Sequence, residues 1–183
     1  MDLPVSAASD RPVHVRLDPA DDLALEEVAP ALAAAPVDPP GIDDHAWLHG
    51  DVGEVLRSLR AACDRRLAAG GRAWIIRVDG TATGYVSARI DDGGARAETF
   101  SVVARAAQGR GIGLAARRLA LDELVAVGVT CVVSLARPGS RSAAISRRLG
   151  YELRGREERA RPDGHLVGLE RYQLRLGDGG PGC

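Results

Sequence analysis

The chain has 183 residues, of which 45% are hydrophobic, and a formal net charge of -1. That length suits one domain with a sizeable core and is short for two. The N-terminal residues contain no apolar run typical of a secretion signal, and no stretch approaches the about eighteen apolar residues of a membrane helix. The sequence therefore predicts a cytoplasmic protein without a membrane span.

Charge and cysteine patterns narrow the class further. Residues 1–60 hold twelve Asp and Glu against four Arg, whereas residues 137–161 hold eight Arg against three Glu. The second segment predicts either an anion-binding face or a solvated basic one. All basic residues are Arg, which together with the Ala and Gly usage suggests a GC-rich bacterial genome. Because Cys63, Cys131 and Cys183 have no paired or zinc-binding spacing, neither a disulfide nor a metal framework is expected.

Hydrophobic periodicity predicts the order β-α-α-β-β-β-α-β-α-β-β, with no internal repeat. Asp51 and Glu54 have the spacing of a capping box at the start of one helix, and Pro30 is expected to disturb another. We expect flexible tails at 1–10 and 177–183 around a single domain at 11–176, with a long loop at 35–50. The expected strands are 13–17, 72–78, 84–90, 95–103, 131–136, 151–158 and 168–176, and the expected helices are 21–34, 51–69, 112–127 and 140–149.

Three glycines in five positions stand at the start of the helix expected at 112–127. The first four backbone N–H groups of a helix have no partner within it and carry the positive end of its dipole. A phosphate can satisfy them if no side chain blocks the approach, which Gly109, Gly111 and Gly113 would allow. Gln108 and Arg110 can add donors at the rim. The structural alternative is a loop that only turns a corner.

Two phosphate-binding patterns do not fit this loop. The P-loop pattern requires a Lys, and the chain has none. The segment GIGLAA fits the dinucleotide pattern G-x-G-x-x-A, but ARAAQGR separates its first glycine from the preceding strand, and the strand precedes a single β-α unit.

The segment SVVARAAQGRGIG resembles the coenzyme A motif of the GNAT superfamily of acyltransferases. GSRSAAISRRLGY is similar to the second signature of that family, with Ser142, Leu149, Gly150 and Tyr151 in register. DGHLVGLERYQL resembles the closing turn and strand of the branch that acetylates protein N-termini, including those of ribosomal proteins. The similarity covers residues 72–176. Gly139, Arg105 and Gly168 depart from residues that are usual in the family.

The resemblance implies an α/β GNAT acyltransferase fold, in which a mixed, mostly antiparallel sheet with a central splay near residue 103 is flanked by helices. It implies an N-acetyltransferase that uses acetyl-CoA as cosubstrate and no metal. The acceptor would be a primary amine, on a small molecule or a protein N-terminus. Two alternatives stay open: transfer of another acyl group, including an aminoacyl group from a charged tRNA, and a non-catalytic domain that binds acyl-CoA and regulates a partner.

The resemblance also implies where the coenzyme lies. The backbone of one strand would hold the pantetheine arm and thioester, the glycine loop would hold the pyrophosphate, and a serine of the second signature would bind the coenzyme or its sulfur. These residues are Phe100, Ser101, Val102, Val103, Gln108, Gly109, Arg110, Gly111, Ile112, Gly113 and Ser142.

Acyl transfer from a thioester to an amine needs a deprotonated amine and a stabilised leaving thiolate. Glu98, on the strand face of Phe100 and Val102, is the best-placed proton acceptor, directly or through water, and Glu158 is a weaker candidate. The structural alternative for Glu98 is a solvated or Arg-paired strand carboxylate. Ser146 stands where many relatives have a Tyr that serves the thiolate, and Ser142 is one turn earlier. A hydroxyl N-cap is the common structural alternative for either Ser140 or Ser142.

The remaining features have a structural alternative beside each functional one. His45 and His49 have helical spacing but lack a third ligand, so no metal site is expected. Trp47 either lines an acceptor pocket or anchors its loop. The arginines of 137–161 can bind the coenzyme's 3′-phosphate, an acidic acceptor or RNA, although no interleaved aromatic residues support RNA binding. We expect a monomer or a homodimer.

Overall fold

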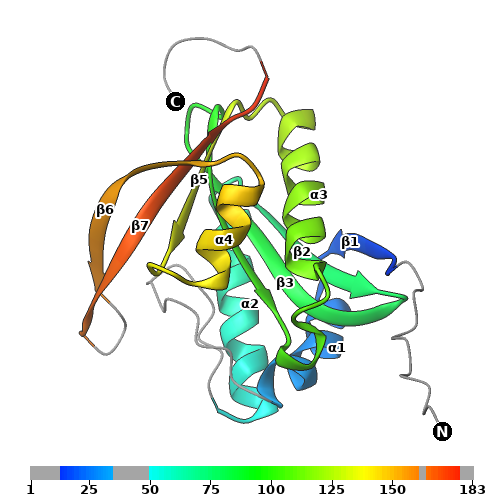
Figure 1. Cartoon of the computed structure of the whole chain (residues 1–183). Coiled ribbons are helices and arrows are strands. Elements are labelled where there is room, and N and C mark those ends of the chain that lie inside the picture. The colour runs from blue at the N-terminus through cyan, green and yellow to red at the C-terminus, as the bar shows by residue number, and fades with distance from the viewer. Residues whose placement is uncertain (1–12, 35–49, 161–163, 178–183) are drawn as a thin grey trace, which may run out of the picture.

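The computed structural model describes residues 13–34, 50–160 and 164–177. The tail expected at 1–10 lies outside this range, and so do residues 178–183 of the tail expected at 177–183. The elements follow the order predicted from the sequence, with one added 3-10 turn (Figure 1). They are β1 (Val15–Pro19), α1 (Asp22–Ala33), α2 (Val52–Ala68), β2 (Arg72–Val78), β3 (Thr81–Ile90), β4 (Arg96–Val103), η1 (Arg105–Ala107), α3 (Ile112–Ala126), β5 (Cys131–Ala136), α4 (Arg141–Arg148), β6 (Glu152–Ala160) and β7 (Leu166–Arg175).

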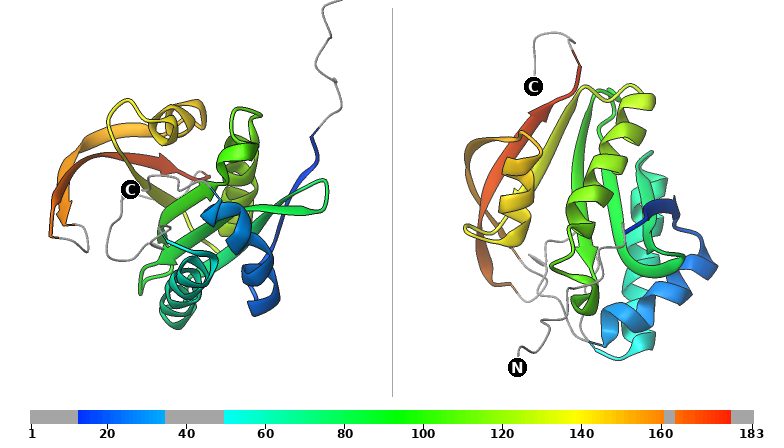
Figure 2. Two further views of the ribbon diagram at one scale, coloured as in Figure 1. Left: turned by 90° about the horizontal axis from the view of Figure 1, so that it is seen from below. Right: turned by 45° about the vertical axis from the view of Figure 1, so that its right-hand side comes forward.

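The strands form one sheet in the order β1-β2-β3-β4-β5-β7-β6. Helices α1 and α2 cover one face and α3 and α4 the other, as both views of Figure 2 show. Each face has its own buried core. Leu32, Leu59 and Ile75 belong to the core under α1 and α2, and Leu124 and Val132 belong to the core under α3. The fold is therefore a three-layer α/β/α arrangement.

The sheet divides at β4 and β5, its one parallel pair among the described strands. These strands pair from Arg96 with Cys131 to Thr99 with Ser134. Beyond Thr99, β4 keeps its pairing with β3 and β5 keeps its pairing with β7, so the two strands separate. The splay thus begins four residues before the position near 103 that the sequence suggested.

Local signals explain the first two helices. Asp51 Oδ1 accepts from the Glu54 N–H at 2.8 Å and the Asp51 N–H donates to Glu54 Oε2 at 2.9 Å, so the capping box is confirmed. Helix α1 runs through Pro30 to Ala33, close to the expected bounds 21–34. Leu32 is fully buried beyond the proline, so packing offsets the missing backbone hydrogen bond.

Two cysteines, Cys63 and Cys131, lie within the described residues. Cys63 is a buried free thiol in α2, and burial raises its pKa. Cys131 is buried in β5, where its Sγ accepts a hydrogen bond from Gln173 Nε2 at 3.3 Å.

Candidate functional site

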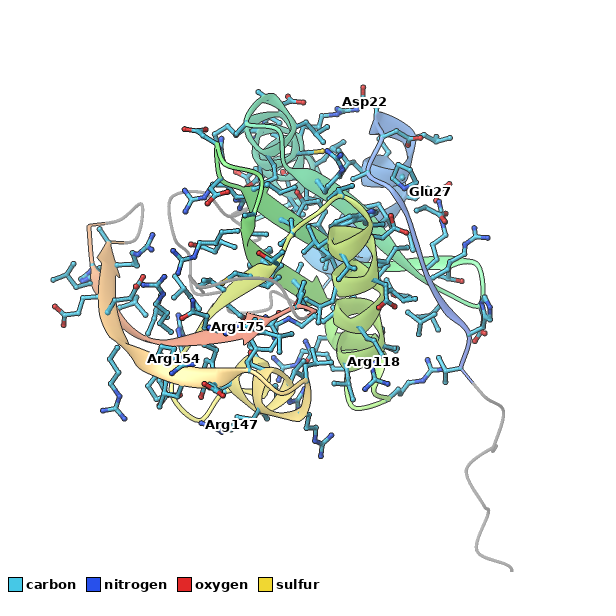
Figure 3. The ribbon with its side chains drawn as sticks, turned by 90° about the horizontal axis from the view of Figure 1, so that it is seen from above. Asp22, Glu27, Arg118, Arg147, Arg154 and Arg175 are labelled. Carbon is cyan, nitrogen blue, oxygen red and sulfur yellow. The ribbon has the colours of Figure 1, made fainter. Side chains whose placement is uncertain are left out.

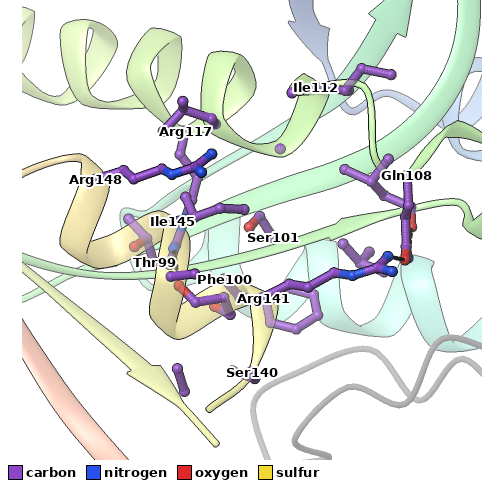
Figure 4. A pocket seen from close by; sticks show the side chains of 18 of the residues that line it. Thr99, Phe100, Ser101, Gln108, Ile112, Arg117, Ser140, Arg141, Ile145 and Arg148 are labelled. Carbon is purple, nitrogen blue, oxygen red and sulfur yellow. Dashed lines mark hydrogen bonds between the residues drawn. The ribbon is translucent and has the colours of Figure 1, made fainter. Parts of the chain in front are cut away.

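The splay between β4 and β5 opens into a cavity of about 440 Å³. Its walls are the second half of β4, the glycine loop with the first turns of α3, the end of β5 and helix α4 (Figure 4). Ten of the expected coenzyme residues line it; Arg110, exposed on the glycine loop, does not. The ten are Phe100, Ser101, Val102, Val103, Gln108, Gly109, Gly111, Ile112, Gly113 and Ser142.

The glycine loop presents an uncapped helix start to this cavity. Gly111 is the N-cap of α3 with φ 77°, Gly109 has φ 83°, and no side chain accepts a hydrogen bond at this cap. A Cβ would meet open space at both positions. The helix therefore begins with free N–H donors that an anion can approach.

Gly113 has a different reason to be glycine. A Cβ there would lie 3.1 Å from Ile145 Cδ1 and 3.7 Å from Val103 Cγ2. Its small size lets α3 pack closely against α4 and β4. Gly113 also lines the cavity, so its lack of a side chain serves this helix packing in addition to the anion access predicted from the sequence.

The side-chain amide of Gln108 is hydrogen-bonded at both ends, so it holds the glycine loop in place rather than presenting free donors at the rim. Its Nε2 donates to the Val103 carbonyl at 2.9 Å, and its Oε1 accepts from Arg141 Nη1. Together with Arg105 and Gly109, Gln108 and Arg141 line a smaller polar hollow beside the main cavity. Positive charge at this entrance comes from arginine side chains.

Strand β4 forms the floor of the splay. Phe100 and Val102 are buried toward α1 and α2, whereas Ser101 and Val103 are partly exposed. From Phe100 onward, the backbone edge that faces β5 has no strand partner among the described residues. The Val103 carbonyl already accepts from Gln108, which leaves the groups before it for a ligand.

The two serines of α4 sit at different depths. Ser142 is partly exposed and lines the cavity, while the N-cap of α4 is Ser140, whose Oγ accepts from the Ala143 N–H at 3.2 Å. Ser146 is fully buried; its hydroxyl donates to the Ser142 carbonyl at 3.1 Å. The N-cap explanation therefore applies to Ser140 and leaves the Ser142 hydroxyl without that structural role.

Arg117 of α3 is a cavity residue that sequence reasoning missed. It is 3% exposed, and burial lowers the pKa of its guanidinium. Its Nη1 donates to Ser146 Oγ at 3.1 Å and to the Ser142 carbonyl at 3.3 Å, and its Nη2 donates to Ser134 Oγ. All three acceptors are uncharged. The available signal was an Arg directly after Ala116, on the apolar side of a helix.

Glu98 lies on the other side of the splay. It forms ion pairs with Arg89 at 3.2 Å and with Arg159 at 4.0 Å, and its side chain is 14% exposed. It lines a second cavity of about 460 Å³ together with residues of β3, β5, β6 and β7. Leu135 lines both cavities, so they meet at the end of β5. Both readings of Glu98 remain compatible with this position.

Other candidates lie apart from the cavities or outside the described residues. Glu158 is exposed on β6 and lines neither of the two cavities. His45, Trp47 and His49 fall outside the described range. Within that range, no group of three or more His, Cys, Asp or Glu side chains is placed to hold a metal ion, and no helix is long and apolar enough to cross a membrane.

Within the described residues 137–160, the arginines do not form one surface. Arg137, Arg141 and Arg148 line the main cavity. Arg147 and Arg156 approach buried Glu170 at 3.5 and 3.6 Å, and Arg154 pairs with Glu152. Figure 3 shows Arg147 and Arg154 on one side of the molecule and the acidic Asp22 and Glu27 of α1 on the other. Part of the segment therefore serves the cavity and part is engaged in local ion pairs.

Comparisons with known proteins agree with this architecture. Residues 40–151 match the acetyltransferase (GNAT) family, whereas no curated protein sequence matches the chain. Among solved structures, yncA, a putative acetyltransferase from Salmonella typhimurium with its cofactor acetyl-CoA, is 22% identical with a TM-score of 0.65, covering 93% of this chain and 98% of that one.

Two further structures carry names from the branch noted in the sequence. RimL, a ribosomal L7/L12 alpha-N-protein acetyltransferase in complex with coenzyme A, is 16% identical with a TM-score of 0.71, covering 88% of this chain and 94% of its own. RimJ of Mycobacterium smegmatis, in complex with CoA-disulfide, is 20% identical with a TM-score of 0.70, covering 88% of this chain and 81% of its own. At these identities, the likeness shows the fold.

Proposed function

Because this chain belongs to the acetyltransferase (GNAT) family, we propose that it transfers an acetyl group from acetyl-CoA to a primary amine by direct attack in a ternary complex. The observation that carries the proposal is the cavity in the splay, which joins an uncapped helix start to an unpaired stretch of β4. An elongated ligand with a phosphate at one end and amide groups along its length fits both features.

The residues present suit coenzyme A. The N–H groups of Ile112 and Gly113 at the start of α3 would hold the pyrophosphate, and the β5-facing edge of Phe100 to Val102 would hold the pantetheine arm by backbone hydrogen bonds. Arg110 and Arg141 at the entrance would add positive charge, and Ser142 would hydrogen-bond near the sulfur. When bound, acetyl-CoA supplies the activated acyl group, so the protein mainly binds and aligns the reactants.

Glu98 is the proposed proton acceptor. The amine nitrogen forms a bond to the acetyl carbon, the carbon–sulfur bond breaks with its electron pair on sulfur, and the amine proton passes to the Glu98 carboxylate directly or through water. Glu98 lines the second cavity beside Leu135, where that cavity meets the splay. The amine would therefore enter from the face of α1 and α2.

Coenzyme binding is tested first by thermal unfolding. Ligand at 100 times its dissociation constant should stabilise the fold by about 2.7 kcal/mol. Gly111→Asp should weaken binding relative to Gly111→Asn, since both side chains tolerate the left-handed backbone and only Asp adds a negative charge. We expect roughly tenfold or more between them, because about 1.4 kcal/mol of repulsion corresponds to that factor. Equal affinities in folded variants would contradict the pyrophosphate assignment.

Turnover decides between an enzyme and a binding protein. Coenzyme binding without acetylation of any amine in a broad panel would favour the regulator alternative. In an active protein, Glu98→Gln should slow turnover about 10²- to 10⁴-fold near neutral pH while leaving coenzyme affinity intact. The loss should shrink at high pH, where more of the amine is already neutral. A structural Glu98 predicts instead a lower melting temperature and near-normal turnover per folded molecule.

A further inference from the structure

The second cavity is lined by four arginines and four acidic residues, and half of these eight residues form ion pairs with one another. Glu98 pairs with Arg89 and Arg159, and Glu157 Oε1 accepts from Arg159 Nε at 2.6 Å. The Asp91 carboxylate accepts from the backbone N–H of Arg96 at the β3–β4 turn, and Asp92 is exposed there. Glu98, Glu157 and Asp91 are therefore all engaged by partners within the protein.

Arg171 of β7 is a lining cation that none of these acids engages. Its guanidinium has no hydrogen bond or ion pair within the described part of the chain, although its side chain is partly buried. The Arg96 side chain also lacks such a partner, and its Nε is buried. A partly desolvated guanidinium without a carboxylate is a ready site for an anion, because its donors match a carboxylate in pairs.

The positions of these two arginines differ. Arg171 pairs across the sheet with Leu135, the residue that lines both cavities. Arg96 pairs with Cys131, four residues further back along β5, which places it about 13 Å from that junction. Of these two arginines, Arg171 is therefore the one that lies beside the point where the two cavities meet.

We infer that the acceptor is a free amino acid or an amino-acid-like zwitterion, whose carboxylate binds Arg171 while its amine faces Glu98. The inference rests on the proposed acetyl transfer and specifies its substrate class. Two strand spacings and a rise of two residues separate the Cα atoms of Glu98 and Arg171, a distance of about 12 Å. The long Arg side chain and the shorter Glu side chain extend into this gap from opposite ends, leaving room for a small zwitterion.

This arrangement discriminates between classes of amine. A protein N-terminus carries its amine without an adjacent carboxylate, because the first carboxyl group is an amide. Such an acceptor would leave Arg171 unpaired, and a simple alkylamine would do the same. Hydrogen bonds to a charged group contribute about 1.5–3 kcal/mol, which corresponds to roughly a 10- to 100-fold preference for the carboxylate.

The experiment compares kcat/KM for the common L-amino acids with that for their α-carboxamides, using the full chain and acetyl-CoA. We expect the preferred amino acid to exceed its carboxamide by roughly 10- to 100-fold. Arg171→Gln should reduce that ratio to near one, and Arg171→Lys should restore part of it. Arg154→Gln is the matched control, since Arg154 pairs with Glu152 on β6 and does not line the cavity; its ratio should remain that of the unmodified protein.

Equal rates for acids and carboxamides in an active protein would overturn the inference and leave acetyl transfer standing. A preference that survives in folded Arg171→Gln would also overturn it. If no amine is acetylated, the proposed function fails, and binding still tests Arg171. In that case, calorimetric titration of the amino acids into the coenzyme A complex should show binding that Arg171→Gln removes, and absence of binding to the unmodified protein would refute the site.

Discussion

Tyr85 offers a test of how tightly the sheet is packed behind the acyl-transfer site. It lies in β3, is 1% exposed and has its ring centroid 6.5 Å from that of Phe100, which lines the splay. Burial raises the pKa of Tyr85 to about 12, and nearby Ser87 offsets only part of this effect. The buried hydroxyl has no hydrogen-bond partner of acceptable geometry among the described residues. Replacement by Phe therefore removes an ionisable group with little change in packing.

The direction of the pH effect follows from the two pKa values. Tyr85 ionises near pH 10 in the unfolded chain and near 12 in the folded protein, so the unfolded state loses its proton first as the pH rises. The stability contribution is fully present below pH 10 and is lost between pH 10 and 12. The loss is about 1.4 kcal/mol at pH 11 and approaches about 2.7 kcal/mol once both states are ionised.

Urea unfolding of the unmodified protein and Tyr85→Phe at pH 8 and pH 11 measures this difference. The other tyrosines titrate in both proteins, so their contributions cancel in the comparison. We expect the unmodified protein to lose about 1.4 kcal/mol more than the variant over this interval. Equal losses would show that Tyr85 is not desolvated in the folded state and would refute the packing argument.

Two further predictions concern the scaffold. Gly84→Ala places a Cβ 2.4 Å from the carbonyl oxygen of Val102 in β4, so we expect it to lower the unfolding free energy by about 1–3 kcal/mol. Gly155→Ala is the control, because a Cβ there meets open space. Equal melting temperatures for the two variants would contradict the close approach at Gly84. Asp51→Ala removes the side-chain half of the capping box and should cost about 1 kcal/mol, and an unchanged urea midpoint would show that the cap contributes nothing.

Local periodicity and caps predicted the element order because each depends on neighbours in sequence. The family suggested by QGRGIG is confirmed, and so is the mostly antiparallel sheet. The position of β7 between β5 and β6 was not predicted, and neither was the end of β4–β5 pairing at Thr99. Both are set by long-range pairing, for which individual strands carry no local signal. The sequence therefore located the splay only approximately.

Residue identity alone did not separate the roles of similar side chains. Gly111 and Gly113 are two positions apart in one motif, yet one has a left-handed backbone facing open space and the other packs against Ile145. Arg159 and Arg171 likewise differ only in their partners, since Arg159 pairs with two acids and Arg171 with none within the described residues. Such distinctions come from the neighbours that the fold supplies.

The role of Ser146 can be decided by separating stability from turnover. The sequence suggested a hydroxyl that serves the leaving sulfur, whereas the folded chain buries it completely against Arg117. If Ser146 only holds the guanidinium, Ser146→Ala should lower the unfolding free energy by about 1.5–3 kcal/mol, the usual range for a hydrogen bond to a charged group. Turnover per folded molecule would then stay near normal. A proton donor to sulfur predicts instead a loss of about 10²- to 10⁴-fold in turnover with little change in stability. Because the hydroxyl is buried while Arg117 lines the cavity, we expect the first result, and a large loss of turnover in a stable variant would contradict it.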